Sequence, residues 1–217
     1  MNDLQLSPEE ARVVAVLVEK SITTPQYYPM TVNAITAAAN QKTSRQPVMN
    51  LTEGEVGSTL NRLEELKLVV RDSFSARAQK WRQQFQHQLL LKPPTQAVLV
   101  TLMLRGPQTA AELRANAAAL GGPGDAAALS AALADLADRA QPLVVELPRA
   151  PGQAATRWAH TLCGAPDAAT SQQVETPRPA ASPAGVTELM QRIQALEARV
   201  SELERQLGVV AETPLAD

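Results

Sequence analysis

The chain has 217 residues, of which 45% are hydrophobic, 19% charged and only 3% aromatic. This composition fits one large or two small globular domains, and the net charge of −2 excludes a uniformly basic protein that coats nucleic acid. Because Cys163 is the single cysteine, an internal disulfide and a thiolate metal cage are excluded as well.

The sequence does not indicate a membrane or secretory segment. Its longest apolar runs, Val13–Val18 and Ala97–Leu104, are far shorter than the roughly 20 residues that a transmembrane helix needs. The first residues include the acidic Asp3, where a secretory signal would carry positive charge, and no long apolar segment follows. We therefore expect a cytoplasmic protein.

The start of the first helix is clearly marked. Ser7 and Glu10 have the spacing of a capping box, and Pro8 suits the first turn, where its missing N–H costs nothing. The pattern predicts a helix from Pro8 to about Ser21. Its centre, Val13–Val18, is apolar on nearly every side, so we expect this helix to lie inside a domain.

Two further helices and a hairpin complete the first unit. A helix is predicted over Thr31–Ala39, and a second capping box, Thr52 with Glu55, starts another that runs to about Lys67. The apolar Val56, Leu60 and Leu63 share one side of that helix. Strand-like residues follow at Leu68–Val70, and a second strand is predicted from Lys80, with Trp81, Phe85 and Leu89 on one face.

The same order of features recurs in the next 80 residues or so. An apolar helix over Gln96–Leu104 precedes a capping box at Thr109 and Glu112. A helix over Asp125–Arg139 then carries Leu129, Leu133 and Leu136, with the spacing of Val56, Leu60 and Leu63, and Leu143–Val145 and Arg157–Trp158 repeat the hairpin features. We interpret this recurrence as an internal duplication.

These elements predict a mainly α protein with small β-hairpins, of the α+β class. Three helices followed by a hairpin is the plan of a winged helix-turn-helix domain, so the fold expected is two such domains in tandem plus a C-terminal coiled-coil helix. The predicted parts are a first winged-helix domain at residues 1–92, a second at 93–164, a flexible Pro/Ala-rich linker at 165–185, and the coiled-coil helix at 186–211.

The coiled-coil segment has an unbroken heptad pattern. Apolar residues alternate steps of three and four through Val186, Leu189, Ile193, Leu196, Val200, Leu203, Leu207 and Val210. Mostly β-branched residues at the first heptad position, with leucine at the fourth, favour a parallel homodimer over packing of this helix on its own chain. The pattern does not separate two strands from three.

Residues for catalysis or metal binding are scarce. His160 and Cys163 are spaced like a pair of metal ligands, but no motif supplies the others, so a core or edge histidine is the favoured interpretation. His87, which alternates with Phe85 and Leu89, is interpreted in the same way. We expect no enzyme activity, cofactor or metal.

Double-stranded DNA is the leading partner, with a near-equal alternative. A third helix that enters the major groove and a hairpin that touches the backbone would bring seven residues of the first unit to DNA. These are Lys42, Arg45, Asn61, Arg62, Arg77, Lys80 and Arg82. Against this, glutamates lie along the same helix, and the second unit offers no base-reading donors. The alternative is a protein–protein adaptor that docks through the second unit and the loop Asn40–Asn50.

Two polar segments carry a resemblance to a known family. Residues 19–29, EKSITTPQYYP, and residues 40–51, NQKTSRQPVMNL, are similar to those of the YceH-like family of bacterial proteins of unknown function. The resemblance extends over essentially the whole chain. It implies a tandem winged-helix fold and a cytoplasmic location in a bacterium, and it brings no activity, cofactor or catalytic residues.

Overall fold

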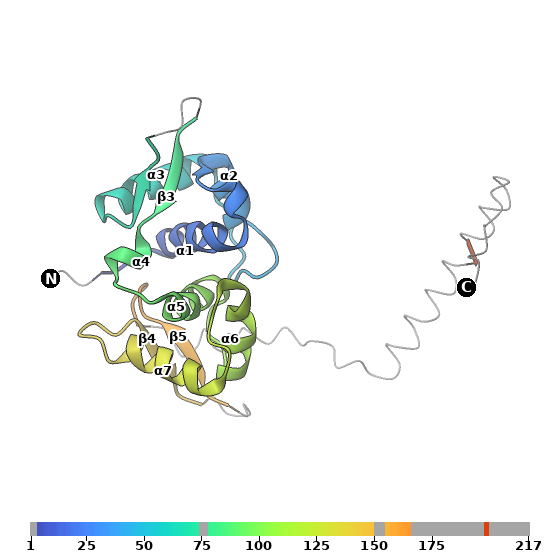
Figure 1. Cartoon of the computed structure of the whole chain (residues 1–217). Coiled ribbons are helices and arrows are strands. Elements are labelled where there is room, and N and C mark those ends of the chain that lie inside the picture. Colours follow the sequence, from blue (N-terminus) through green and yellow to red (C-terminus); the bar gives the residue numbers. More distant parts are fainter. Residues whose placement is uncertain (1–3, 74–77, 150–154, 166–197, 200–217) are drawn as a thin grey trace, which may run out of the picture. The chain divides into compact units, whose positions relative to one another are not determined.

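We describe the protein from a computed structural model, which places residues 4–73, 78–149, 155–165 and 198–199. The chain divides into two compact units, residues 1–172 and 173–217. Within the described residues the fold is mixed α and β, with seven α-helices and two small antiparallel sheets, all in the first unit (Figure 1). This agrees with the predicted α+β class.

We call residues 4–92 the first half and residues 93–165 the second half. The elements of the first half are α1 (Pro8–Thr23), a 3-10 turn (Pro25–Tyr27), β1 (Met30–Thr31), α2 (Val32–Ala39), α3 (Glu53–Glu65), β2 (Val69–Arg71), β3 (Lys80–Gln83) and α4 (Phe85–Gln88). Those of the second half are α5 (Pro93–Arg105), α6 (Ala110–Ala117), a 3-10 turn (Ala118–Leu120), α7 (Ala126–Ala137), β4 (Val144–Leu147) and β5 (Arg157–His160).

The helix starts follow the capping patterns of the sequence. Ser7, Thr52 and Thr109 each accept a hydrogen bond from the backbone N–H three residues later, and the carboxylate of the glutamate there accepts one from the backbone N–H of the cap residue. The helix α5 begins three residues before the predicted Gln96, because Pro93 and Pro94 occupy its first turn, where no N–H is needed.

The second strand of the first half is shorter than predicted. β3 ends at Gln83, and Phe85 to Gln88 form the short helix α4, so Phe85 and Leu89 do not share a strand face with Trp81. The neighbouring strand β2 has only three residues, and the last hydrogen bond toward it is the one that the Gln84 N–H donates to the Leu68 carbonyl at 2.7 Å, so no strand partner is left for Phe85 to Leu89. His87 lies exposed on α4, which corrects its interpretation as a core or edge histidine.

The two halves have the same order of elements and similar sheets. In the first, the strand order is β1-β3-β2, and Met30 of β1 lies opposite Trp81. In the second, β4 pairs with β5, and Gln108 bridges to Trp158 by two backbone hydrogen bonds of 2.7 and 3.0 Å. Each half therefore places a tryptophan on its central strand beside the residue that precedes its second helix.

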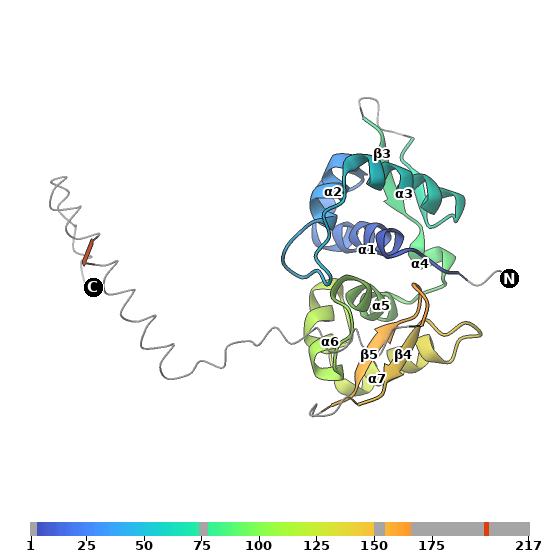
Figure 2. The ribbon, with the colours of Figure 1, turned by 180° about the vertical axis from the view of Figure 1, so that it is seen from behind.

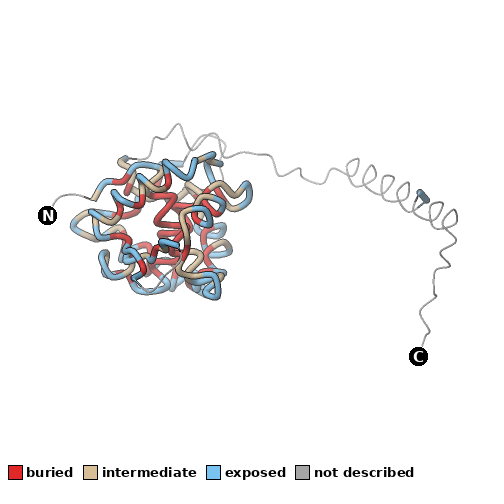
Figure 3. Tube along the Cα trace, turned by 90° about the horizontal axis from the view of Figure 1, so that it is seen from above, coloured by how far each residue is buried: buried red, intermediate tan, exposed pale blue. Residues whose placement is uncertain are grey.

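One hydrophobic core runs through both halves. The apolar centre of α1, Val13–Val18, is fully buried as predicted, and α1 packs against α5 of the second half. Viewed from behind, the two helices lie next to each other between the sheets (Figure 2). The buried segments accordingly gather at the centre of this unit (Figure 3).

The predicted linker and coiled coil lie outside the described residues, apart from Ala165 and the helical, exposed pair at 198–199. All eight residues of the predicted heptad seam are among those not described. No described helix is both long and apolar enough to cross a bilayer.

Candidate nucleic-acid interface

The helix α3 presents a polar face of small side chains to solvent. Val56, Leu60 and Leu63 are fully buried, and their burial turns Gly54, Ser58 and Asn61 outward. Nothing but its own N-cap lies within 4.0 Å of where a side chain on Gly54 would be. A face with so little bulk allows close approach to a partner surface.

The cations on and beside α3 are held by carboxylates. The Arg62 guanidinium lies 2.8 Å from the Glu65 carboxylate and 3.9 Å from that of Glu10. Arg71, on β2, lies 3.1 Å from the Glu64 carboxylate and donates a 2.8 Å hydrogen bond to the Asn61 side chain. The pairing of Arg71 thus ties the hairpin to the exposed face of α3.

The hairpin carries its cations on two opposite faces. Arg71 pairs across the ladder with Trp81, and its guanidinium lies 5.0 Å from the centre of the Trp81 ring. Arg82 pairs with Val70 and therefore points to the other side, where it is 2.7 Å from the buried Asp72 carboxylate and 5.9 Å from the Tyr28 ring.

The remaining predicted contacts are scattered. Lys80, half-buried on β3, shares the face of Arg82, because side chains two residues apart in a strand point to the same side. The backbone N–H of Asp72 donates to the Lys80 carbonyl at 2.8 Å. Lys42 is exposed in the loop before α3 and has no ion pair with another described residue. Arg77 lies outside the described residues.

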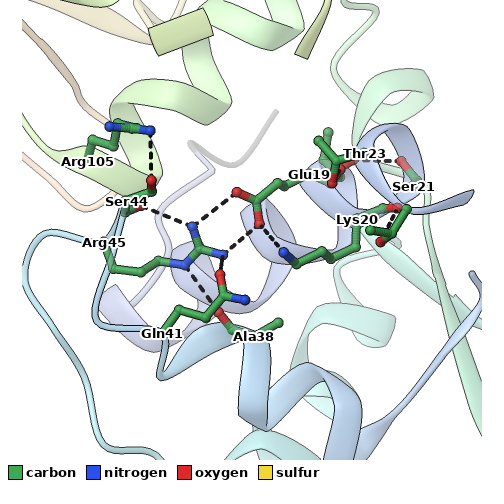
Figure 4. Close-up of polar contacts among 11 residues, drawn as sticks. Glu19, Lys20, Ser21, Thr23, Ala38, Gln41, Ser44, Arg45 and Arg105 are labelled. Carbon is green, nitrogen blue, oxygen red and sulfur yellow. Dashed lines mark hydrogen bonds and ion pairs between the residues drawn. The ribbon is translucent and has the colours of Figure 1, made fainter. Parts of the chain in front are cut away.

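Arg45 is not a surface cation, which corrects its place among the predicted contacts. Its side chain has no exposed area, and it donates two hydrogen bonds, of 2.6 and 3.1 Å, to the Glu19 carboxylate of α1 (Figure 4). It also donates to the Ala38 carbonyl at 3.2 Å and to the Gln41 side chain at 2.9 Å. Every face of the guanidinium is therefore occupied from within the chain.

Glu19 remains a carboxylate in this setting. Burial alone would raise its pKa, but hydrogen bonding to Arg45 and the charges of Arg45 and Lys20 outweigh burial and hold the pKa below its ordinary value. The buried pair is thus an ion pair at neutral pH.

The loop 40–50 joins the two halves through this cluster. Ser44 accepts a 2.7 Å hydrogen bond from Arg105 of α5, and the backbone N–H of Gln46 donates to the Leu104 carbonyl at 2.8 Å. On the other side, the buried Arg12 donates to the carbonyls of Ala39 and Pro47 at 3.2 and 2.7 Å. Several polar side chains of the loop, those of Asn40, Gln41, Ser44 and Arg45, are therefore used inside the molecule.

Sequence reasoning missed Arg12 as a polar residue of the core. Desolvation, with the nearby charge of Arg45, lowers the pKa of Arg12 to about 10, so the side chain stays charged. Its position inside the otherwise apolar α1 is the one local signal that would have revealed it, because a lone arginine there needs buried acceptors.

The second half offers a different surface. The exposed residues of α7 are mainly alanines and the acidic Asp135 and Asp138, which donate no hydrogen bonds to bases. Beside it, a hollow of about 360 Å³ is lined by Ala111, Leu129, Leu133 and Trp158. This surface is apolar and weakly acidic, and it has few donors for bases.

In the described part of the chain, no further potential metal ligands join His160 and Cys163. Burial lowers the pKa of His160 to about 4, and its Nδ1 has no hydrogen-bond partner in the structure. Burial, with the charges of Glu9 and Glu10, raises the pKa of Cys163 to about 11, so the thiol stays protonated. Among the described residues, no three potential ligands gather at one place.

Comparisons with known proteins give the chain clear relatives. The model of a family described as "Protein of unknown function, DUF480" matches residues 6–153. A UPF0502 protein of Burkholderia multivorans is 44% identical over 97% of this chain and 92% of its own length. A UPF0502 protein of Burkholderia cenocepacia is 42% identical over the same shares, and one of Burkholderia orbicola is 50% identical over 74% of this chain and 67% of its own.

Proposed function

The chain belongs to the DUF480 family of bacterial proteins of unknown function, and we propose that it is a non-enzymatic, regulator-type protein that binds double-stranded DNA. In this proposal the first half makes the contacts, with α3 in the major groove and the β2–β3 hairpin on the backbone. The proposal takes the two halves as winged helix-turn-helix domains in tandem, and the order of three helices followed by a hairpin in each half supports it.

The observation that carries the proposal is the exposed face of α3 together with the cations beside it. Gly54, Ser58 and Asn61 face solvent without bulk, and an asparagine side chain offers both a donor and an acceptor to an adenine edge. Arg71 and Arg82 extend from the adjoining hairpin and keep 49% and 46% of their side chains exposed.

The ion pair of Arg71 with Glu64 is compatible with phosphate binding, because both side chains are partly exposed, whereas Arg82 keeps its pair with the buried Asp72 carboxylate. Pairs between exposed side chains contribute only about 0.2 to 1 kcal/mol each, so a phosphate can replace the carboxylate at small cost. The glutamates then remain as repelling charges near the duplex, which predicts modest affinity that falls steeply as salt concentration rises.

Two copies working together would offset this modest affinity. The heptad pattern of residues 186–210 supports a parallel homodimer, and joining two binding domains raises the effective concentration of the second one. The proposed function also implies a cytoplasmic location, where bacterial DNA is found.

A fluorescence anisotropy titration of the full chain against mixed-sequence duplexes, at low and at moderate salt, tests the proposal. We expect micromolar or tighter binding at low salt and a clear loss at moderate salt. Absence of binding at micromolar protein under both conditions would remove DNA as the partner.

A protein–protein adaptor is the second candidate, and the apolar hollow beside α7 favours it. Leu129, Leu133 and Trp158 line a site of the size that binding pockets commonly have. Pull-down from lysate with and without nuclease separates the two functions. A specific partner that is retained after nuclease and lost in a variant of the exposed lining residue, Ala111→Arg, supports docking.

A further inference from the structure

The outer edge of β4 carries backbone groups that no other described segment binds. Trp158 exchanges both of its backbone hydrogen bonds with Gln108, so its ladder neighbour Glu146 directs its own N–H and C=O away from β5. Because backbone groups alternate in direction along a strand, the N–H and C=O of Val144 also point away from β5, whereas those of Val145 point toward Ala159. The edge therefore offers two donors and two acceptors.

An apolar hollow lies against this edge. It has a volume of about 640 Å³ and is lined by Leu4, Ala137, Pro142, Val144, Val145 and Trp158, among others. Consecutive strand residues point to opposite faces of a sheet, so a hollow that touches both Val144 and Val145 reaches around the strand's edge. The edge thus combines open backbone hydrogen-bonding groups with apolar surface.

In the first half the corresponding edge is that of β2, and charged side chains lie beside it. There, the backbone N–H and C=O groups of Val69 and Arg71 of β2 point away from β3. This follows because the alternate residues Leu68 and Asp72 make the backbone hydrogen bonds to the β3 side, at 2.7 and 2.8 Å. The hollow beside that edge is lined by Glu64, Lys67 and His87 together with glutamines. Charged side chains along an edge prevent another strand from pairing with it.

We propose that β4 pairs in antiparallel fashion with β4 of a second copy of this chain, across a twofold axis at Val145. In this register Val144 lies opposite Glu146 of the other copy, and the outward groups of both residues bond across the axis. The two small sheets become one sheet of four strands, and the valine at the axis packs on its counterpart over the apolar hollow.

The sequence around β4 suits a second copy better than an unrelated strand. Pro142 and Pro148 occupy the next outward-facing positions on either side, and neither has an N–H to donate. In the twofold register these prolines lie opposite each other, so the pairing ends at both sides without a lost donor. An unrelated strand would place carbonyl groups opposite Pro142 and Pro148, which have no N–H to donate to them.

Charge does not oppose this register. Glu146 is the only ionised side chain of β4, and it lies opposite a valine and not opposite its own counterpart. Its carboxylate accepts a hydrogen bond from Thr156 within the sheet. The two glutamates are diagonal neighbours, about 7 to 8 Å apart at the backbone, where solvent screens their repulsion.

Cross-linking at the axis tests the proposal, and it does not depend on DNA binding. In a full-length Cys163→Ser background, Val145→Cys places two thiols at a non-hydrogen-bonded pair, with Cα atoms about 4.5 Å apart, which suits a disulfide. Val70→Cys is the matched control, since Val70 occupies the same position in β2 and is 36% exposed, against 37% for Val145. Copper–phenanthroline serves as the oxidant.

We expect the Val145→Cys protein to form a covalent dimer at least tenfold faster than the Val70→Cys protein, as followed on non-reducing gels. Pairing of the C-terminal helices would accelerate both variants alike and so would not produce this difference. Equal rates, or a slower rate at position 145, would overturn the proposal and leave the edge open to another partner.

A second variant tests whether backbone hydrogen bonds at the β4 edge are responsible for the cross-linking. Adding Glu146→Pro to Val145→Cys removes one outward donor and spares every bond to β5, because the N–H of Glu146 points away from that strand. We expect cross-linking to slow severalfold while the thermal unfolding midpoint of the reduced protein changes little. An unchanged cross-linking rate contradicts pairing through this edge.

Discussion

The helices α3 and α7 hold corresponding places in the two halves, and both bury large apolar residues at the same spacing. Val56, Leu60 and Leu63 do so in α3, and Leu129, Leu133 and Leu136 in α7. Their exposed faces have little in common. The first shows serine, asparagine and arginine together with three glutamates beside a cationic hairpin, and the second shows alanines and aspartates beside an apolar hollow.

This contrast separates the requirements of folding from those of recognition. Packing against α1 or α5 fixes the apolar positions in both halves, because a cavity in a shared core costs several kcal/mol. No such constraint acts on the outward positions. The two halves therefore keep one plan and differ in the surfaces with which they meet partners.

Equivalent core leucines should contribute equally to one folding transition. Leu60→Ala in the first half and Leu133→Ala in the second should each lower the free energy of unfolding by about 2 to 5 kcal/mol, because both side chains are buried. Urea denaturation followed by far-UV circular dichroism and by tryptophan fluorescence checks this. Separate transitions for the two halves would show that they do not share one core.

Loss of the buried ion pair should be almost as damaging. Glu19→Gln leaves the Arg45 charge without its carboxylate, and we expect a loss of about 3 kcal/mol in the free energy of unfolding. Glu65→Gln is the control, since its pair with Arg62 lies on the surface and contributes less than about 1 kcal/mol. Similar losses for the two variants would mean that the cluster between the halves is not a tight contact.

The difference between the surfaces should appear in DNA affinity. Replacing Lys80 and Arg82 by alanine should weaken binding about tenfold and reduce the dependence of log affinity on log salt by about one per lost phosphate contact. Arg114→Ala on α6 of the second half should leave both unchanged. Anisotropy titrations at three salt concentrations provide the measurement, and an equal effect of the Arg114 change would count against a role confined to the first half.

We expect a smaller effect on the pH dependence of stability, which should differ between the two sheets. His160, a half-buried residue whose Nδ1 is buried, lies two residues after Trp158, where the first half has Gln83 two residues after Trp81. Because its pKa falls from about 6.5 to about 4 on folding, the unfolded chain binds more protons between these values, and stability decreases as the pH falls through that range.

His160→Gln, which copies the first half, should flatten this dependence. Thermal unfolding at pH 7, 6 and 5 checks it, since the contribution of Glu19 is lost only below its ordinary value of 4.5, as the pH falls through its lowered folded pKa. If the variant keeps the slope of the parent protein between pH 7 and 5, another group is responsible.

Local patterns were sufficient to predict most elements of the described fold. The capping boxes at Ser7, Thr52 and Thr109 fix helix starts within a few residues, and the spacing of Val56, Leu60 and Leu63 identifies the buried side of α3. The length of β3 was not predictable in this way, because it depends on how far the neighbouring strand β2 extends.

The roles of the arginines could not be predicted from local patterns. Arg45 stands in a polar loop that looks exposed, and its burial depends on Glu19, which is 26 residues away. The pairing of Arg71 with Glu64 and Asn61 likewise requires the hairpin to fold back on α3. Residue types on a helix face follow from spacing, but the partners of long charged side chains follow from tertiary contacts.

Hydrogen–deuterium exchange of the full chain, with and without a short mixed-sequence duplex at low salt, tests the division of roles most directly. We predict slower exchange on DNA addition in α3 and the β2–β3 hairpin, with α7 and the β4–β5 hairpin unchanged. Protection centred on α7 and its hairpin, or no protection in any element at saturating duplex, would contradict the account.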